Sequence, residues 1–160
     1  MKKIFYIALS VILIVLTLAS CASGRKFTYN EFSIRLPSDT QALTSDDFDV
    51  VYKTTRGVNV YVVSTTYAEL TQAGFTDLSM DAAVFAEANL KALSGAEAIS
   101  SVYTLSRDIA YYSYTIQDYY WTMAVCKGEK AIYYVQFCCY DSVKEAHVSQ
   151  IIEWAKTIRV

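Results

Sequence analysis

Apolar and polar residues alternate along the first part of the chain after residue 26, in the manner of strands. In residues 27–36 the alternation puts Phe32, Ile34 and Leu36 on one face. A polar, acidic stretch over 38–49 predicts a loop, and Thr55-Arg56-Gly57 is typical of a hairpin turn. Three strands are therefore expected in this part of the chain, at residues 27–36, 50–54 and 58–67.

Two later segments repeat apolar residues every three or four positions, which predicts helices. The first is expected to begin at Ser79, a favourable N-cap, with Asp81 in its first turn, and to end at Gly95. The second is expected to begin at Ser142, where Glu145 three residues on would complete a capping box. It runs nearly to the last residue.

Four further strands are expected between the helices, at residues 98–106, 109–117, 119–127 and 130–140. The breaks between them are short, which predicts an antiparallel meander with Gly128-Glu129 as its last turn. Residues 132–139 are apolar or aromatic almost without interruption, as in a sheet covered on both faces. The order β-β-β-α-β-β-β-β-α predicts an α+β fold, an antiparallel sheet flanked by two helices.

The first 21 residues have a different pattern. Lys2 and Lys3 precede an apolar run of 15 residues, Ile4 to Leu18, which is short for a membrane span of about 20 residues and typical of a cleaved export signal. The run ends in Leu18-Ala19-Ser20-Cys21, which resembles the lipobox of bacterial lipoproteins. The alternative is an uncleaved N-terminal anchor helix with Cys21 as an ordinary residue.

The lipobox predicts the domain organisation and the location. We expect a signal peptide at 1–20, a lipidated Cys21 with a tether over 21–26, and a single α+β domain at 27–160. Two or three acyl chains on Cys21 would hold the protein firmly in a membrane of the bacterial cell envelope. Alanine after the cysteine implies, by the enterobacterial sorting rule, the periplasmic side of the outer membrane in a diderm cell. The expected place is otherwise the outer face of the cell membrane.

Charge excludes some partners. The chain has 14 basic and 16 acidic residues, and loss of Lys2 and Lys3 with the signal leaves 12 basic residues and a net charge of −4. The positive residues are scattered along the sequence, so we expect neither nucleic-acid binding nor docking to anionic lipid beyond the acyl anchor.

Cysteines and acidic residues are the candidates for metal or redox chemistry. Cys126, Cys138 and Cys139 lie on the arms of one predicted hairpin, with Cys126 opposite Ala131, too far apart for a disulfide, so buried free thiols are expected. A metal site would need paired cysteine spacings or more histidines. The run Asp46-Asp47-Phe48-Asp49 lacks the glycine turn and distal glutamate of a calcium loop. No metal or cofactor is expected.

His147 is the sole histidine and the only candidate general base. A hydrolase would need it beside a serine such as Ser149, with a carboxylate such as Asp141 or Glu145 to orient it. On an amphipathic helix these residue types are typical of a solvated face. We expect no enzyme and no catalytic residue, and the hydrolase stays open as a hypothesis.

Nine of the 14 tyrosines lie in the predicted meander: Tyr103, Tyr111, Tyr112, Tyr114, Tyr119, Tyr120, Tyr133, Tyr134 and Tyr140. Alternation is expected to put Tyr112, Tyr114 and Tyr120 on one side of the sheet, and Tyr111, Tyr119 and Tyr133 on the other. Tyrosine suits strands, so simple packing explains the cluster. The alternative is an aromatic recognition surface.

The mature chain resembles the PsbP-like family of α/β/α sandwiches. The resemblance lies in the element order, in FSIRLP at 32–37, in YYVQF at 133–137 and in the closing helix with Ile151-Ile152 and Thr157-Ile158. It implies a binding or assembly module, as in photosystem accessory proteins and bacterial lipoproteins. The expected function is a non-enzymatic envelope lipoprotein that binds a protein partner. The alternative is a small-molecule or glycan binder that uses the tyrosine-rich sheet.

Overall fold

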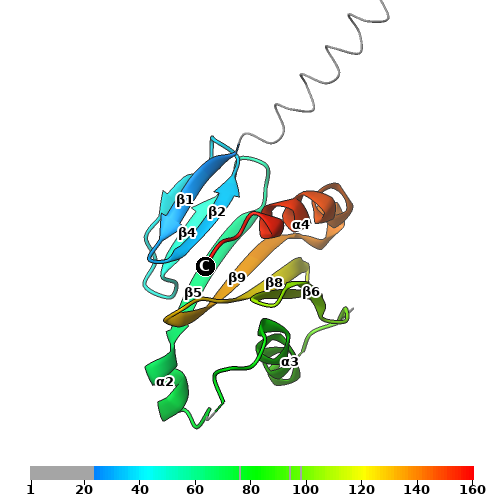
Figure 1. The fold of residues 1–160 in the computed structure, drawn as a ribbon. Coiled ribbons are helices and arrows are strands. Elements are labelled where there is room, and N and C mark those ends of the chain that lie inside the picture. Colours follow the sequence, from blue (N-terminus) through cyan, green and yellow to red (C-terminus); the bar gives the residue numbers. More distant parts are fainter. Residues whose placement is uncertain (1–23, 76, 94, 98) are drawn as a thin grey trace, which may run out of the picture.

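The computed structural model describes residues 24–75, 77–93, 95–97 and 99–160 (Figure 1). Its centre is a seven-stranded antiparallel sheet in the order β3-β4-β5-β9-β8-β7-β6. The strands are β3 (Gln41–Leu43), β4 (Val50–Lys53), β5 (Asn59–Thr66), β6 (Tyr103–Ser106), β7 (Ile109–Ile116), β8 (Tyr119–Lys127) and β9 (Ala131–Tyr140). The predicted α+β class and the meander from β6 to β9 are confirmed.

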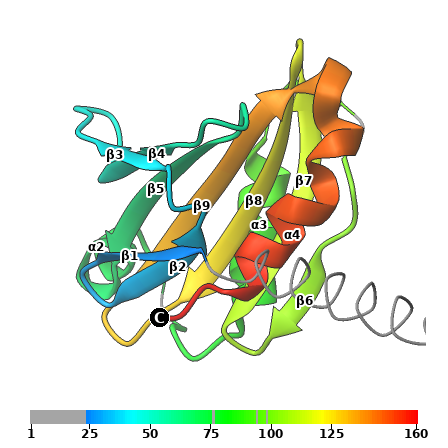
Figure 2. The same ribbon diagram turned by 90° about the horizontal axis from the view of Figure 1, so that it is seen from above.

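Helices cover both faces of this sheet, as expected from the long apolar runs (Figure 2). Helix α3 (Ala82–Ala92) packs against β7 and β8 on one face. Helix α4 (Val148–Lys156) lies on the other face, beside a separate two-stranded sheet of β1 (Arg25–Tyr29) and β2 (Phe32–Leu36). A short helix, α2 (Tyr67–Gln72), follows β5.

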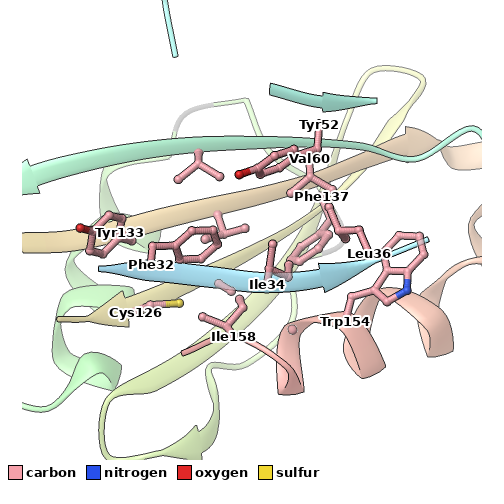
Figure 3. Close-up of a cluster of buried hydrophobic side chains, with 14 of the residues drawn as sticks. Phe32, Ile34, Leu36, Tyr52, Val60, Cys126, Tyr133, Phe137, Trp154 and Ile158 are labelled. Carbon is pink, nitrogen blue, oxygen red and sulfur yellow. The ribbon is translucent and has the colours of Figure 1, made fainter. Parts of the chain in front are cut away.

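The larger core lies between the sheet and the layer formed by β2 and α4 (Figure 3). Phe32, Ile34 and Leu36 alternate inward from β2 and are fully buried, as the sequence pattern predicts. The Phe32 ring stacks on Tyr133 of β9 with centroids 5.6 Å apart, and Trp154 of α4 joins the same cluster. This contact holds the hairpin onto the sheet.

The single strand expected over 27–36 is wrong, because the chain turns back at Asn30, whose φ is +50°. Asparagine tolerates this left-handed conformation better than most residues, so it closes a hairpin. Strand β1 also takes in Arg25 and Lys26, which we assigned to the tether. The predicted loop over 38–49 likewise contains the short edge strand β3.

The predicted N-caps of both long helices are wrong. Helix α3 begins at Ala82 with Asp81 as its N-cap, and the Ser79 hydroxyl donates instead to Asp77, 2.6 Å away. Residues 141–146 form a 3-10 helix, and α4 begins only after His147.

A capping box does occur, at the start of α2, where no helix was expected. The Thr66 hydroxyl accepts from the Glu69 amide at 3.2 Å, and the Glu69 carboxylate accepts from the Thr66 amide at 2.7 Å. Two backbone donors that a helix start leaves unpaired are thereby satisfied.

The turn between β8 and β9 lies one residue later than predicted. Cys126 lies opposite Tyr133 and Cys138 opposite Trp121, a shift of two residues from the expected pairing. The Gly128 amide donates to the Ala131 carbonyl at 2.9 Å, which places the two-residue turn at Glu129-Lys130 and not at Gly128-Glu129.

The predicted signal peptide and the lipid attachment at Cys21 fall on residues 1–23, outside the described residues. Among the residues that are described, no helix is both long enough and apolar enough to span a membrane.

Candidate functional site

Helix α3 leaves one end of its sheet face uncovered, and a hollow of about 260 Å³ lies there. We call it the aromatic hollow. Its lining residues are Gly57, Asn59, Tyr61, Tyr119, Trp121, Cys138, Cys139 and Tyr140. They come from the turn before β5 and from β5, β8 and β9, so the floor is rigid sheet and not loop.

Strand register brings these residues together from distant parts of the sequence. Asn59 lies opposite Cys138, which lies opposite Trp121, so the three form one row across β5, β9 and β8. Tyr119 and Tyr140 form the next row. Since side chains alternate along a strand, both rows project on the α3 face.

The aromatic rings form two stacked groups. Tyr119 and Tyr140 stack with ring centroids 5.0 Å apart, and Tyr61 lies 6.0 Å from Trp121. Trp121 also stacks nearly parallel on Tyr114, at 6.4 Å and 8°. Tyr119 is 38% exposed and Tyr140 57% exposed, so this pair presents aromatic surface to solvent. Exposed, stacked aromatic rings of this kind are enriched in binding interfaces.

Three titratable groups of the aromatic hollow have raised pKa values. Burial raises the pKa of Tyr61, and the neighbouring Tyr140 phenol raises the pKa of Tyr119. Burial also raises the pKa of the Cys138 thiol to about 12, so the reactive thiolate is disfavoured. The arrangement can stack on a flat or apolar group and hydrogen-bond through phenols and an amide.

The tyrosine pattern is confirmed in part. Tyr112 and Tyr114 share the α3 face, while Tyr111 and Tyr133 lie on the α4 face, as predicted. Two residues of β8 were placed on the wrong faces: Tyr120 packs against the α4-side core, and Tyr119 borders the aromatic hollow on the α3 side.

The packing interpretation holds for the tyrosines beneath α3. Tyr112 is fully buried, and its hydroxyl donates to the Asn89 side chain of that helix. Tyr119 and Tyr140 lie beyond the helix, and for them the recognition surface stays a prediction.

Sequence reasoning missed Tyr61, Trp121 and Asn59 as members of a site. Alternation along the strands could have identified two of them. Trp121 lies on the same face of β8 as Tyr119, and Tyr61 lies on the face of β5 opposite to the buried Val60. What alternation could not supply is the strand order, because β5 and β9 are neighbours despite 64 residues between Thr66 and Ala131.

Cys126, Cys138 and Cys139 are buried free thiols, as predicted. In the described part of the chain, no group of three histidine, cysteine or acidic residues could hold a metal ion. Asp49, from the acidic run at 46–49, accepts from the Ser64 amide at 2.6 Å.

In the described structure, the His147 side chain forms no hydrogen bond with a serine or a carboxylate, as the hydrolase hypothesis would require. The Nδ1 atom of His147 is buried without a hydrogen-bond partner in the described structure. Asp141 instead accepts from Lys144 at 2.9 Å and from Thr115 at 3.2 Å. These contacts tie the 3-10 helix to the sheet.

A second hollow, of about 290 Å³, brings together positive residues that are scattered along the sequence. We call it the basic hollow. It lies where β1 and β2 meet the end of the chain, and its lining residues are Lys26, Ser33, Ile34, Arg35, Lys156, Thr157 and Arg159. Four of the seven are cationic. They are far apart in the sequence, and the fold brings them together.

Comparison with known proteins supports the fold. The chain is similar to cyanobacterial PsbP (CyanoP) from Synechocystis sp. PCC 6803, whose solution structure it matches with a TM-score of 0.55 at 14% identity, over 87% of this chain and 93% of that one. The fold is PsbP-like. A crystal structure from Bacteroides thetaiotaomicron VPI-5482 matches with a TM-score of 0.55 at 18% identity, over 86% of this chain but only 48% of that one. No protein-family model and no curated protein sequence matches.

Proposed function

We propose that this protein is a non-enzymatic binding or assembly module of the bacterial cell envelope, lipid-anchored through Cys21, and that the aromatic hollow contacts a protein partner. The observation that carries the binding role is the exposed Tyr119–Tyr140 pair beside Trp121. Tyrosine and tryptophan dominate the energetics of protein interfaces because they bury much area for little lost side-chain entropy.

The size of the aromatic hollow favours a protein partner. Ligand pockets for small molecules usually hold about 300–1,000 Å³, and this hollow holds about 260 Å³. It suits one side chain of a partner, with Tyr140 and Tyr119 forming part of a wider contact around it. The membrane location rests on the apolar run and on the Leu18-Ala19-Ser20-Cys21 motif.

A photo-crosslinking experiment in the cells that make the protein tests the binding role. A photoreactive phenylalanine would replace Tyr140 in one strain and Tyr103 in another. Tyr103 is a matched control, since it is 50% exposed and stacks on Tyr111 at 5.3 Å, but it lies on edge strand β6. We expect a discrete protein adduct from position 140 that weakens with Tyr119→Ala. Equal adducts from both positions, or none, would contradict the proposal.

A separate experiment tests the anchor. Cells fed a labelled fatty acid should produce a labelled, membrane-bound protein that is shorter by the signal peptide. The Cys21→Ser variant should lose the label and remain uncleaved or leave the membrane fraction. An unlabelled wild-type protein with an intact N-terminus would support the uncleaved anchor helix instead.

A glycan ligand is the second candidate, because the aromatic hollow combines flat rings with the Asn59 amide and phenol hydroxyls. Sugars bind such surfaces by stacking and by hydrogen bonding. Envelope glycan fragments should then change the fluorescence of Trp121 and compete with the adduct at position 140. The Trp121→Phe variant identifies the signal, since Trp154 is the second tryptophan and lies buried on the other face.

A further inference from the structure

The basic hollow is built by three chain segments that align as strands. Lys26 of β1 lies directly opposite Arg35 of β2. Ser33 of β2 lies opposite Arg159 through an antiparallel bridge, in which each residue's amide donates to the other's carbonyl at 2.8 and 2.9 Å. Alternation therefore puts Lys26, Arg35 and Arg159 on one face, turned away from the buried Ile34.

The cations in this hollow are poorly compensated. Directly opposed like charges on neighbouring strands destabilise a sheet, and Lys26 and Arg35 are such a pair. Lys156 forms an ion pair with Glu153 at 2.6 Å, and the pair is exposed. Within the described structure, the lining of the hollow contains no carboxylate. A bound anion would relieve this repulsion.

The arginines are held by backbone oxygens, which orient them without neutralising them. An Nη1 atom of Arg35 donates to the Gly24 carbonyl at 3.3 Å. Arg159 donates through Nη1 to the carbonyls of Lys156, at 3.0 Å, and Ile158. Guanidinium groups keep several further donors, whose fork geometry matches phosphate oxygens.

The basic hollow lies where the chain leaves the domain toward residue 21. Gly24 is fixed against β2, since a Cβ atom there would lie only 2.7 Å from the Leu36 carbonyl oxygen. Three residue steps span at most about 11 Å. Cys21 is therefore within that reach of Gly24, and a lipid on Cys21 would hold the hollow near headgroups.

We propose that the basic hollow binds the phosphate group of an anionic phospholipid at the membrane surface, and so fixes the orientation of the anchored domain. Phosphate recognition rests on the hollow alone, while the lipid as its source rests on the proposed membrane anchor. Each basic residue near an anionic membrane is worth about fivefold in affinity, or about a hundredfold for three.

Amide hydrogen exchange on the full chain, purified from the membranes of the producing cells, tests this proposal. The chain would be studied in nanodiscs of phosphatidylcholine, with and without phosphatidylglycerol. The informative amides are those of Ser33, Arg35 and Arg159, whose hydrogen bonds join β2 to residues 157–159. When the concentration of the anionic phospholipid is ten times its dissociation constant, a phosphate that bridges these segments slows exchange of their amides about tenfold.

Two triple variants of equal charge separate this site from general attraction. Lys26→Gln/Arg35→Gln/Arg159→Gln should abolish the protection by phosphatidylglycerol. Lys53→Gln/Arg56→Gln/Lys91→Gln removes three exposed cations elsewhere and should retain it. If the first triple variant does not fold, the single variant Lys26→Gln provides a milder test, in which about fivefold weaker affinity lowers the protection from about tenfold to about threefold.

The phosphate source is separated by adding inorganic phosphate to discs of phosphatidylcholine alone. Protection by phosphatidylglycerol and not by inorganic phosphate supports the proposal. Protection by inorganic phosphate alone would overturn the lipid as ligand, and no protection in either arm would overturn the site. Equal loss of protection in the two triple variants would also overturn the site. Recovery of the protein in the membrane fraction reports on the anchor independently, so the two proposals fail separately.

Discussion

The Phe32→Ala substitution tests whether the hairpin of β1 and β2 is part of the cooperative core. Phe32 is fully buried and stacks on Tyr133 of β9. Removing a buried phenylalanine costs about 3–5 kcal/mol, of which the stacked pair contributes about 0.5–1.5 kcal/mol. A typical domain is stable by only about 5–15 kcal/mol, so the loss is a large fraction.

Equilibrium unfolding in urea measures this loss. With an m-value near 2 kcal/mol/M, a loss of about 4 kcal/mol lowers the midpoint by about 2 M. Phe48→Ala is the control, because Phe48 lies half-buried in a loop and packs its ring against Tyr61. We expect this variant to lose about 1 kcal/mol of unfolding free energy or less. A Phe32→Ala loss below about 1 kcal/mol with an unchanged m-value would refute the reasoning, since the hairpin would then be an independent appendage.

Three further predictions concern single groups. Tyr112→Phe removes a hydroxyl that donates to Asn89, and should lower the unfolding free energy by about 1 kcal/mol, with no further loss when Asn89→Ala is added. Burial raises the pKa of the Cys138 thiol from 9.0 to about 12, so the unfolded chain loses this proton at lower pH than the folded chain. The unfolding free energy therefore falls as pH rises from 9.0 to about 12. The difference between urea midpoints measured below and above pH 9.0 should be smaller in Cys138→Ala than in the wild type. Gly24→Ala puts a Cβ atom 2.7 Å from the Leu36 carbonyl oxygen, so the backbone must shift; calorimetry should show a loss of about 1–3 kcal/mol, and an unchanged melting temperature would contradict the close approach.

Alternation and apolar runs predicted β7, β8 and β9 because both signals are local, whereas β6 begins five residues later than predicted. Strand β8 has the predicted bounds, and β7 and β9 differ from prediction by one residue. Turn chemistry was less informative, because the same residue types occur in several turn geometries. Asn30 closes a hairpin inside the predicted strand, where the apolar phase of Phe27 and Tyr29 changes at Asn30-Glu31 to that of Phe32, Ile34 and Leu36.

The capping signals show how tertiary context overrides a local motif. Ser142 and Glu145 have the spacing of a capping box, but Asp141 binds Lys144 and Thr115, and the segment forms a 3-10 helix. Thr66 and Glu69 have the same spacing and do form the box. Sequence alone does not distinguish the two cases.

Both candidate sites depend on long-range register, which the sequence does not reveal. The aromatic hollow needs β5 beside β9, and the basic hollow needs the bridge between Ser33 and Arg159. The tyrosine cluster was visible in the sequence, but the register decides which tyrosines are exposed. The convergence of the cations had no sequence signal, because 120 residues lie between Arg35 and Lys156.

The location of the aromatic hollow follows from how the two faces of the sheet are covered. At 1.5 Å per residue, the 11 residues of α3 extend about 16 Å, whereas the 10 residues of β9 extend about 33 Å. A helix of that length, even when aligned with the strands, covers half of their length. On the other face α4 is shorter still, with nine residues, but the hairpin of β1 and β2 extends the layer, and the core beneath is closed. Among the described residues, no second layer covers the α3 face at the end where Tyr119 and Tyr140 lie, and amphipathic tyrosine rings cover the sheet there. A partner bound at this end would cover the α3 face of the sheet, as the hairpin of β1 and β2 covers the opposite face.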